Sequence, residues 1–187
     1  MSSPELAGEG LLPQKVQAIS EVLERHAIPY AFGGAIALGY HAEPRATDDI
    51  DLNILLTPDR ADSVLSALDE LFEIPEREER LRQLSDQDQT RLLWDKTYVD
   101  LFFMDTAFHE SLAGRTGRVE FGDREIPIIS AEDLVVCKAL FNRPHDWSDI
   151  ARVGLIQGEK LDKAYVERWL EFFVGTGDPI LDRFRKI

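Results

Sequence analysis

The sequence predicts an α+β fold (mixed α/β), in which a mixed sheet is flanked by helices and followed by a C-terminal set of helices. Three observations predict it. Apolar residues recur at helical spacing near the N-terminus, short alternating segments with tight turns fill the middle of the chain, and helical periodicity returns after residue 130. With 187 residues, of which 44% are hydrophobic, the chain can bury a sizeable core.

The first half of the chain predicts helices and strands in alternation. We expect residues 1–12 to form a loose segment. Pro13 is expected to begin a helix that ends at His26. The elements expected after it are, in order, a strand at 28–32, a short helix at 35–40, a strand at 48–56, a helix at 59–71 and a short strand at 72–74.

The second half predicts two hairpins and then helices. The charged residues at 75–84 favour a solvated helical face or a loop. Residues 85–89 are expected to form a polar turn. The elements expected after them are a hairpin of 90–94 and 97–104, a helix at 107–116, a hairpin of 118–121 and 125–129, and helices that begin near Ala131, Asp146 and Asp162. We interpret residues 13–130 as the core and 131–187 as a C-terminal helical region packed on it, in one compact domain.

The chain is strongly acidic. Its formal net charge of −14 argues against broad, non-specific nucleic-acid binding, which needs many Lys and Arg side chains to neutralise phosphates. It leaves room for RNA held by a local basic patch, and it suits a cationic substrate. Cys137 is the only cysteine, which excludes an internal disulfide. In its apolar helical run, Cys137 indicates a small core residue rather than a nucleophile.

Several features predict a cytoplasmic protein without a membrane partner. The sequence has no apolar run of about 18 residues, so no transmembrane helix is expected. The first ten residues lack the basic region and the apolar core of a secretory signal. A single cysteine also suits a reducing compartment.

Two acidic residues share one face of the strand at 48–56. Side chains alternate between the faces of a strand, so Asp49, Asp51 and Asn53 point to one side and the apolar residues to the other. Residues two apart on one face lie about 6.5 Å apart, which allows both carboxylates to bind one cation or a pair of cations. Asp48 falls in the preceding turn or on the apolar side and is not counted as a ligand.

A third acid lies in the strand at 97–104. Asp100 stands in the middle of the apolar segment TYVDLFFM, where an unpaired buried carboxylate would be very costly. A cation bound by a neighbouring strand would supply the partner. If the two strands are neighbours, Asp49, Asp51 and Asp100 form one cluster.

Gly33 and Gly34 join the strand at 28–32 to the short helix. Backbone N–H groups at a helix N-terminus bind anions, and glycine adopts backbone angles that a side chain forbids. Each feature has an ordinary alternative: a Gly-Gly pair is usually a turn, two acids two apart are usually a solvated face, and an isolated Asp in a strand is usually salt-bridged. Their combination in this order favours a site for a metal and a nucleotide phosphate.

The pattern of Gly33-Gly34, the segment TDDIDL at 47–52 and Asp100 resembles the nucleotidyltransferase superfamily of the DNA polymerase β type. Its hallmark is a glycine followed by glycine or serine, then two acids separated by one apolar residue, then a later acid between apolar residues. Within it, the chain looks most like the bacterial abortive-infection toxin-like (AbiEii-like) nucleotidyltransferases, and less closely like the aminoglycoside nucleotidyltransferases. The resemblance covers residues 15–155 and implies a nucleotidyltransferase-fold core.

The resemblance also implies a set of site residues. Asp49, Asp51 and Asp100 would be catalytic and would bind Mg²⁺, as two ions, with Mn²⁺ as the alternative. The residues expected to bind the NTP are Gly33, Gly34, Arg45, Thr47 and Lys138, and Asp149 is expected to support the site.

Three of these residues have structural alternatives. Arg45 either contacts a nucleotide phosphate or forms a salt bridge with Glu43 or Asp48. Thr47 also caps the entry to the strand. A Lys on an apolar helix usually extends its amine to the surface, so Lys138 has a role at the site only through the resemblance.

Three functions remain open. The first is transfer of a nucleotide to RNA, such as tRNA, or to a protein, in a toxin–antitoxin setting with an antitoxin as partner. The second is transfer to a small hydroxylated molecule such as an aminoglycoside. The third is a non-catalytic nucleotide-binding or partner-binding protein, against which the three intact acids argue. A basic rim around the cleft would favour RNA, and an acidic rim would favour a small cation.

Overall fold

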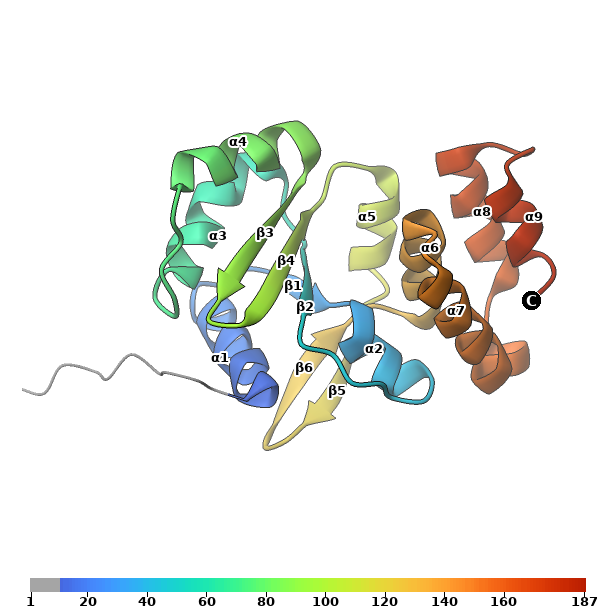
Figure 1. Cartoon of the computed structure of the whole chain (residues 1–187), viewed down its shortest axis with the longest axis horizontal. Helices are drawn as coiled ribbons and strands as arrows, with labels where there is room; N and C mark the ends of the chain where they lie inside the picture. The colour runs from blue at the N-terminus through green and yellow to red at the C-terminus, as the bar shows by residue number, and fades with distance from the viewer. Residues whose placement is uncertain (1–10) are drawn as a thin grey trace, which may run out of the picture.

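A six-stranded sheet forms the centre of the computed structural model, which describes residues 11–187 (Figure 1). The strands are β1 (Tyr30–Phe32), β2 (Ile50–Ile54), β3 (Gln89–Trp94), β4 (Thr97–Phe103), β5 (Gly117–Phe121) and β6 (Arg124–Ile128). Their order is β3-β4-β2-β1-β6-β5. Strands β2 and β4 are parallel, as are β1 and β6, and the other neighbours are antiparallel. The sheet is therefore mixed, which confirms the predicted fold class.

Helices cover both faces of this sheet. They are α1 (Leu12–Arg25), α2 (Gly34–His41), α3 (Ala61–Leu68), α4 (Arg77–Gln87), α5 (Ala107–Ala113), α6 (Ala131–Phe141), α7 (Pro144–Gln157), α8 (Lys163–Val174) and α9 (Pro179–Phe184), with short 3-10 helices η1 (Pro58–Arg60) and η2 (Gly158–Lys160). Across residues 11–187, no helix is both long enough and apolar enough to span a membrane.

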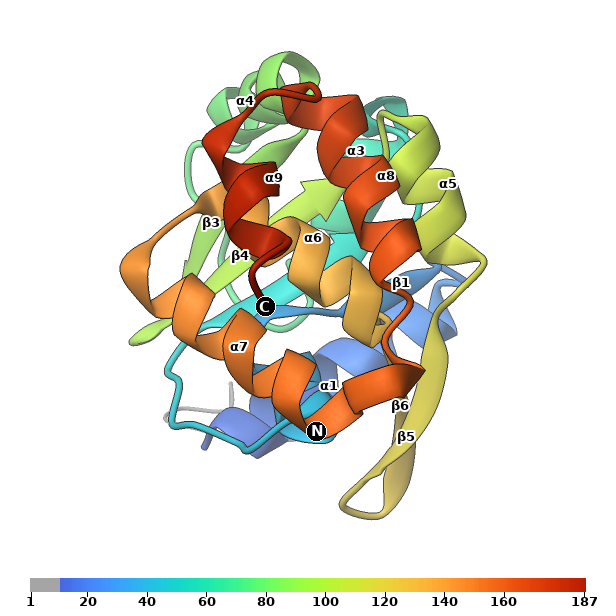
Figure 2. The same cartoon turned by 90° about the vertical axis from the view of Figure 1, so that its right-hand side faces the viewer.

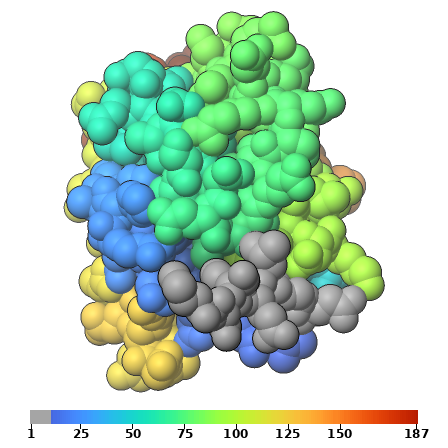
Figure 3. Space-filling model, turned by 90° about the vertical axis from the view of Figure 1, so that its left-hand side faces the viewer, coloured from blue at the N-terminus to red at the C-terminus, as the bar shows by residue number. Residues whose placement is uncertain are grey.

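The helices form two layers of different character. Helices α7, α8 and α9 pack on or near α6 on one side of the molecule (Figure 2). Helices α1 and α3 pack side by side on the other, where their side chains form a continuous surface with the chain that follows α3 (Figure 3). Buried apolar side chains of both layers belong to one core cluster, which includes residues of α1 and α3 and also of α6 and α8.

The core face of the sheet follows the predicted alternation. Ile50, Leu52 and Ile54 of β2 are fully buried. They lie beside Val99, Leu101 and Phe103 of β4 in the parallel register. Burying each such side chain contributes about 1.5–3 kcal/mol, so a one-residue slip in register would exchange this face for the polar one at a large cost.

Helix α6 is buried along most of its length. Ser130 caps its N-terminus, where the hydroxyl oxygen accepts a hydrogen bond from the Asp133 N–H at 3.1 Å, and the helix begins at Ala131 as predicted. Apolar side chains on several sides of the helix pack against the sheet side and against α7 and α8. Lys138 is buried within this helix, so a charged side chain lies inside the protein beside the sheet.

The predicted strand at 72–74 is wrong. Phe72 and Ile74 are buried, which explains the apolar signal, but Phe72 stacks on Trp94 with the ring centroids 5.0 Å apart. The Ile74 N–H donates to the carboxylate of Asp69 at 3.1 Å instead of to a strand. A side chain therefore satisfies the backbone where a sheet neighbour was expected.

Three element boundaries also differ from the prediction. The expected turn at 85–89 is helix as far as Gln87, because Asp88 ends α4 in the left-handed conformation with φ of 57°. Helix α7 begins at Pro144 rather than at Asp146, and Arg143 is its N-cap. Of the predicted loose segment at 1–12, residues 1–10 lie outside the described residues, and Leu12 begins α1, one residue before the predicted start at Pro13.

Candidate active site

A row of charged side chains crosses three neighbouring strands. Asp51 of β2 is the register partner of Asp100 of β4, and Asp100 is the partner of Arg91 of β3. Neighbouring strands lie about 4.8 Å apart, so the three side chains stand side by side on one face of the sheet. The strands at 48–56 and 97–104 are thus neighbours, as the clustering of the acids required.

Asp51 packs directly against the first turn of α2. The Gly33 N–H donates to the Asp51 carbonyl oxygen at 2.9 Å, which joins the end of β1 to β2. Gly34 has φ of 49°, and a Cβ at this position would lie 1.7 Å from Oδ2 of Asp51. Glycine is therefore required here by its backbone angle and by the carboxylate that fills the space beside it.

The environment of Asp51 disfavours its charged form. Burial raises the pKa of this carboxyl group, and the neighbouring charge of Asp100 raises it further, followed by that of Asp49. The ammonium group of Lys138 acts in the opposite direction. The net effect is a raised pKa, because the nearby cation does not compensate for burial beside two other acids.

Asp100 has a partner that the sequence analysis did not name. Arg91 donates from Nε to Oδ1 at 2.6 Å and from Nη2 to Oδ2 at 2.7 Å, a two-point contact. The Asp100 side chain is 14% exposed and that of Arg91 53%. The hydrogen bonds to this carboxylate raise the pKa of Arg91. A guanidinium therefore occupies the side of Asp100 that faces β3.

Asp49 lies just before β2 rather than within it. Its N–H donates to the Thr47 hydroxyl at 3.2 Å, and the Thr47 hydroxyl donates to the Asp49 carbonyl oxygen at 3.3 Å. Thr47 thus caps the entry to the strand, as expected. Within residues 11–187, no three side chains of His, Cys, Asp or Glu are grouped in a way that would hold a metal ion.

The paired carboxylates still fit a divalent cation in their chemistry. Carboxylate oxygens are the hard donors that Mg²⁺ prefers. Asp51 and Asp100 stand in register on adjacent strands, and their charges repel each other, because Asp100 adds to the effect of burial in raising the pKa of Asp51. A cation between them would relieve that repulsion, and Asp49 is the nearest further acid along the chain.

Opposite Asp51, α6 and α7 hold a cluster of ion pairs. The amine of Lys138 donates to Asp149 at 2.7 Å and to Asp146 at 3.4 Å. Arg45 donates to Asp149 at 3.2 Å, and Arg143 donates to Asp146 at 2.7 Å. Three cations thus share two buried carboxylates, which leaves an excess of positive charge on this side.

These contacts bear on the alternatives for two residues. Lys138 does not reach the surface, since its side chain is only 5% exposed. Arg45 pairs with Asp149 of α7 and not with its sequence neighbours Glu43 or Asp48. Asp149 therefore positions both cations, which is the kind of support expected of it.

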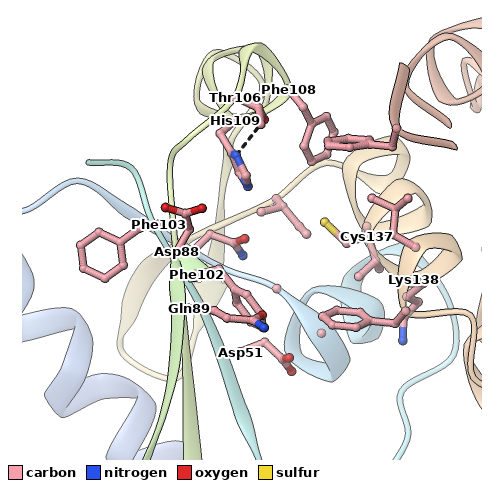
Figure 4. A pocket seen from close by; sticks show the side chains of 18 of the residues that line it. Asp51, Asp88, Gln89, Phe102, Phe103, Thr106, Phe108, His109, Cys137 and Lys138 are labelled. Carbon is pink, nitrogen blue, oxygen red and sulfur yellow. Dashed lines mark hydrogen bonds between the residues drawn. The ribbon is translucent and has the colours of Figure 1, made fainter. Parts of the chain in front are cut away.

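A cavity of about 350 Å³ separates the sheet from α6. Figure 4 shows Asp51, Gln89 and Phe102 on the strand side and Cys137 and Lys138 on the helix side. The predicted residues that line it are Gly33, Gly34, Arg45, Asp51 and Lys138. Apolar and aromatic side chains form much of the remaining wall, including Phe102, Phe108, Ile129, Leu134, Phe141 and Phe173.

A second cavity of about 460 Å³ adjoins the first on the far side of Phe102. It borders both Asp51 and Asp100. Its remaining lining consists of basic, amide, hydroxyl and aromatic side chains: Arg80, Gln83, Gln87, Gln89, Thr90, Arg91, Phe102, Phe141 and Arg143. Asp51 therefore lies where the two cavities meet, and Asp100 borders the second cavity alone.

Several lining residues carried no role in the sequence analysis. Asn53 shares the face of Asp51, and its side-chain nitrogen lies 2.8 Å from where a Cβ of Gly33 would stand. The alternation of side chains in β2 predicted the face on which Asn53 lies, but it assigned Asn53 no role in the site. Arg91 could have been found from the predicted hairpin, because a two-residue turn at 95–96 sets it opposite Asp100.

Comparison with known families settles the relationship. The sequence model of the family described as nucleotidyl transferase AbiEii toxin, type IV toxin–antitoxin system, matches residues 17–169. The chain belongs to this family. The match confirms the predicted superfamily and the predicted subgroup within it.

Solved structures show that this AbiEii-family chain shares its fold with other nucleotidyltransferases. The antibiotic-resistance factor ANT(2'')-Ia is 14% identical with a TM-score of 0.62, covering 86% of this chain and 92% of its own. The lincosamide antibiotic adenylyltransferase LnuA, with lincomycin bound, is 16% identical with a TM-score of 0.53, covering 79% and 99%.

A third structure gives the same result for the AbiEii-family fold. An antigenic nucleotidyltransferase-like protein from Paracoccidioides brasiliensis is 16% identical with a TM-score of 0.50, covering 93% of this chain and 92% of its own. No curated protein matches the sequence significantly. At these identities the solved structures establish the fold alone, so substrates have to be argued from the site.

Proposed function

We propose that this protein is a metal-dependent nucleotidyltransferase that moves an NMP group from an NTP to a hydroxyl group of RNA. The observation that carries the proposal is the pairing of Asp51 with Asp100, directly against Gly34. It brings the Asp51 carboxylate to the N-terminal turn of a helix, where backbone N–H groups favour phosphate, with Asp100 beside it on the next strand.

Asp49, Asp51 and Asp100 are the proposed ligands of Mg²⁺, with Mn²⁺ as a substitute. Bound there as two ions, the metal would stabilise charge on the α-phosphate and on the leaving pyrophosphate. Asp100 borders the second cavity, so its carboxylate is placed to take the proton of an attacking hydroxyl group. This assignment gives each of the three acids a role in the site.

The triphosphate is proposed to lie between α2 and α6. The first turn of α2 offers N–H groups that have no partner within the helix. Gly34 allows a close approach, because its position has no side chain. On the opposite wall, Lys138 and Arg45 line the cavity, and the carboxylates of Asp146 and Asp149 hold this cluster of cations in place.

The nucleoside is proposed to occupy the apolar end of the first cavity. Phe102, Phe108 and Phe173 line this end, and aromatic rings stack favourably on a flat base. Gln87 and Asp88 on the same wall offer hydrogen-bonding groups for the edge of the base. The leaving pyrophosphate would then lie on the Gly34 side, and the acceptor would approach from Asp100.

The basic character of the second cavity supports RNA as the acceptor. Arg80, Arg91 and Arg143 line it beside Asp100, and arginine is suited to phosphate recognition by its two-point geometry. The net charge of −14 argues against broad nucleic-acid binding, but a local basic surface of this kind can still bind RNA. An RNA acceptor such as tRNA, with an antitoxin as regulating partner, also agrees with the toxin–antitoxin description of the family.

A small cationic acceptor is the second candidate. Asp88 and Asp105 line the far part of the first cavity, where they would attract an amine. Burial raises the pKa of Asp88, and its contact with Asp105 raises it further, which shows that the two acids are close. LnuA, which shares the fold, acts on a small antibiotic. The candidate is weaker because these acids lie away from Asp100, to which the acceptor hydroxyl has to come.

An acceptor screen tests the proposal. The purified protein is incubated with Mg²⁺ and each of the four NTPs radiolabelled at the α-phosphate, separately with total tRNA, with a panel of aminoglycosides, and alone. The proposal predicts label in the tRNA. Label in an aminoglycoside would select the second candidate, label in the protein itself would select a protein acceptor, and failure to bind any NTP would favour a non-catalytic protein.

A further inference from the structure

Three arginines from different parts of the chain converge on the second cavity. Arg80 comes from α4, Arg91 from β3 and Arg143 from the N-cap of α7. Three glutamine side chains and Thr90 line the same space. Apart from the two acids Asp51 and Asp100 at one edge, the charge of this cavity wall is carried by guanidinium groups and the other polar groups are neutral. Such a composition suits an oxyanion such as phosphate beside a metal held by the acids.

Arg80 has hydrogen-bonding capacity to spare. Its Nε is buried and has no partner among the described residues. Its Nη1 donates to Gln83 at 3.2 Å, and its Nη2 lies 3.7 Å from the carboxylate of Glu76. A buried donor without an acceptor is unfavourable, and an oxyanion that reached it would satisfy it.

Arg91 is placed to exchange partners. Its guanidinium holds both oxygens of Asp100 and lies over the ring of Tyr98, 4.7 Å from the ring centroid. The side chain is half exposed and borders the cavity, so it can turn toward an anion without disturbing the core. A guanidinium and a divalent cation bound to one carboxylate repel each other, so each weakens the binding of the other.

We propose that the second cavity binds a phosphate group of the acceptor and that Arg91 passes from Asp100 to this phosphate when the acceptor binds. Arg80 supplies the fixed part of the phosphate site, and Arg91 supplies the part that moves. The inference rests on the proposed function, because it takes Asp100 as a metal ligand. Its consequence is that acceptor phosphate and metal bind with positive cooperativity, so that the site binds metal most tightly when an acceptor is present.

The test follows Mn²⁺ binding by the EPR signal of free Mn²⁺, without any NTP. The probe is a short single-stranded oligoribonucleotide, and its own Mn²⁺ binding is measured in parallel and subtracted. In the wild-type protein we expect the oligoribonucleotide to lower the Kd for Mn²⁺ about three- to fivefold, the range that release of an exposed ion pair supports. The same oligomer with neutral methylphosphonate linkages should have no effect.

Arginine variants separate the parts of the proposal. Arg91→Gln should lower the Kd for Mn²⁺ about three- to fivefold without the oligoribonucleotide, which should then have no further effect. Arg80→Gln should weaken oligoribonucleotide binding and leave Mn²⁺ binding in its absence unchanged. Arg82→Gln removes the same charge from the same helix, where the side chain pairs with Glu79 outside this cavity, and should match the wild type.

The outcomes distinguish this inference from the proposed function. If Asp51→Asn and Asp100→Asn lose Mn²⁺ binding while Arg91→Gln binds Mn²⁺ as the wild type does, the partner exchange is overturned and the proposed function stands. Equal binding of the oligoribonucleotide to Arg80→Gln, Arg91→Gln and wild type would overturn the phosphate site. If neither Asp variant changes Mn²⁺ binding, the proposed metal site and the exchange are both overturned.

Discussion

The Asp51 carboxylate occupies the space that a side chain at residue 34 would need. A Cβ on Gly34 would lie 1.7 Å from Oδ2 of Asp51, and the backbone of Gly34 has φ of 49°. The turn at Gly34 and the strand of Asp51 therefore pack as a single unit, in which the absence of a side chain at residue 34 makes room for the Asp51 carboxylate.

Replacement of Gly34 should disrupt this unit. Gly34→Ala places a methyl group on the Asp51 carboxylate and puts a side chain at a positive φ, so we expect a loss of more than about 1 kcal/mol of stability together with loss of transfer activity. Gly177→Ala is the matched control, because nothing lies within 4 Å of its Cβ position. Urea unfolding of both variants measures the difference, and equal stability would contradict the contact.

Asp51→Asn should abolish transfer and raise the melting temperature. The pKa of Asp51 is raised by burial and then by Asp100, so folding disfavours the charged form of this carboxyl group. A neutral amide of similar shape removes that cost. Asp100→Asn should not be stabilising, since Asp100 is paired with Arg91. A melting temperature for Asp51→Asn below that of the wild type would contradict the electrostatic account.

The ion-pair cluster predicts a pH-dependent contribution of Asp146. Burial alone would raise the pKa of Asp146, but the hydrogen bond from Arg143 and the charges of Lys138 and Arg143 outweigh it and lower the pKa. A lowered pKa stabilises the fold above the unfolded-state value of about 3.9, and this contribution is lost as the pH falls through the folded-state value. Asp146→Asn should cost about 2 kcal/mol at pH 7, and the cost should fade below about pH 4.

Denaturant titrations at several pH values measure this cost. Asp182→Asn, in which an acid that is 63% exposed is removed, should match the wild type throughout. A deficit for Asp146→Asn that is the same at every pH would show that the side chain acts through packing and not through its charge.

Cys137 should report on the occupation of the first cavity. Burial raises the pKa of its thiol to about 12, and the carboxylates of Asp133 and Asp51 raise it as well. Alkylation by iodoacetamide should therefore be slow at pH 7.5 and should accelerate continuously up to pH 10. Because Cys137 lines the cavity, Mg²⁺ with the preferred NTP should slow alkylation at pH 9.5. An unchanged rate would contradict the placement of the nucleoside there.

The parts of the site that follow from local alternation were predictable from sequence. The pattern of residues 48–56 placed Asp51 on the polar face and Ile50 and Leu52 in the core, and the structure agrees. The two-residue turn at 95–96 fixes the register of its hairpin, so even the pairing of Arg91 with Asp100 was within reach.

The contacts that depend on tertiary packing were not predictable. Arg45 meets Asp149 across 104 positions of the chain, because the loop after α2 lies beside α7. No periodicity in either segment encodes that approach. The strand predicted from the apolar residues Phe72 and Ile74 was wrong for the same reason. Both side chains are buried by tertiary packing, in which Phe72 stacks on Trp94 of the hairpin, and not in a strand of their own.

The most direct test of the central claim is nucleotidyl transfer by the wild type and by the double variant Asp49→Asn, Asp51→Asn. Both proteins are incubated with Mg²⁺, an NTP radiolabelled at the α-phosphate and total tRNA, after circular dichroism has shown that both are folded. The account predicts labelled RNA with the wild type, none without Mg²⁺ and none with the double variant. Full transfer by the folded double variant would contradict the assignment of these acids as the catalytic metal ligands.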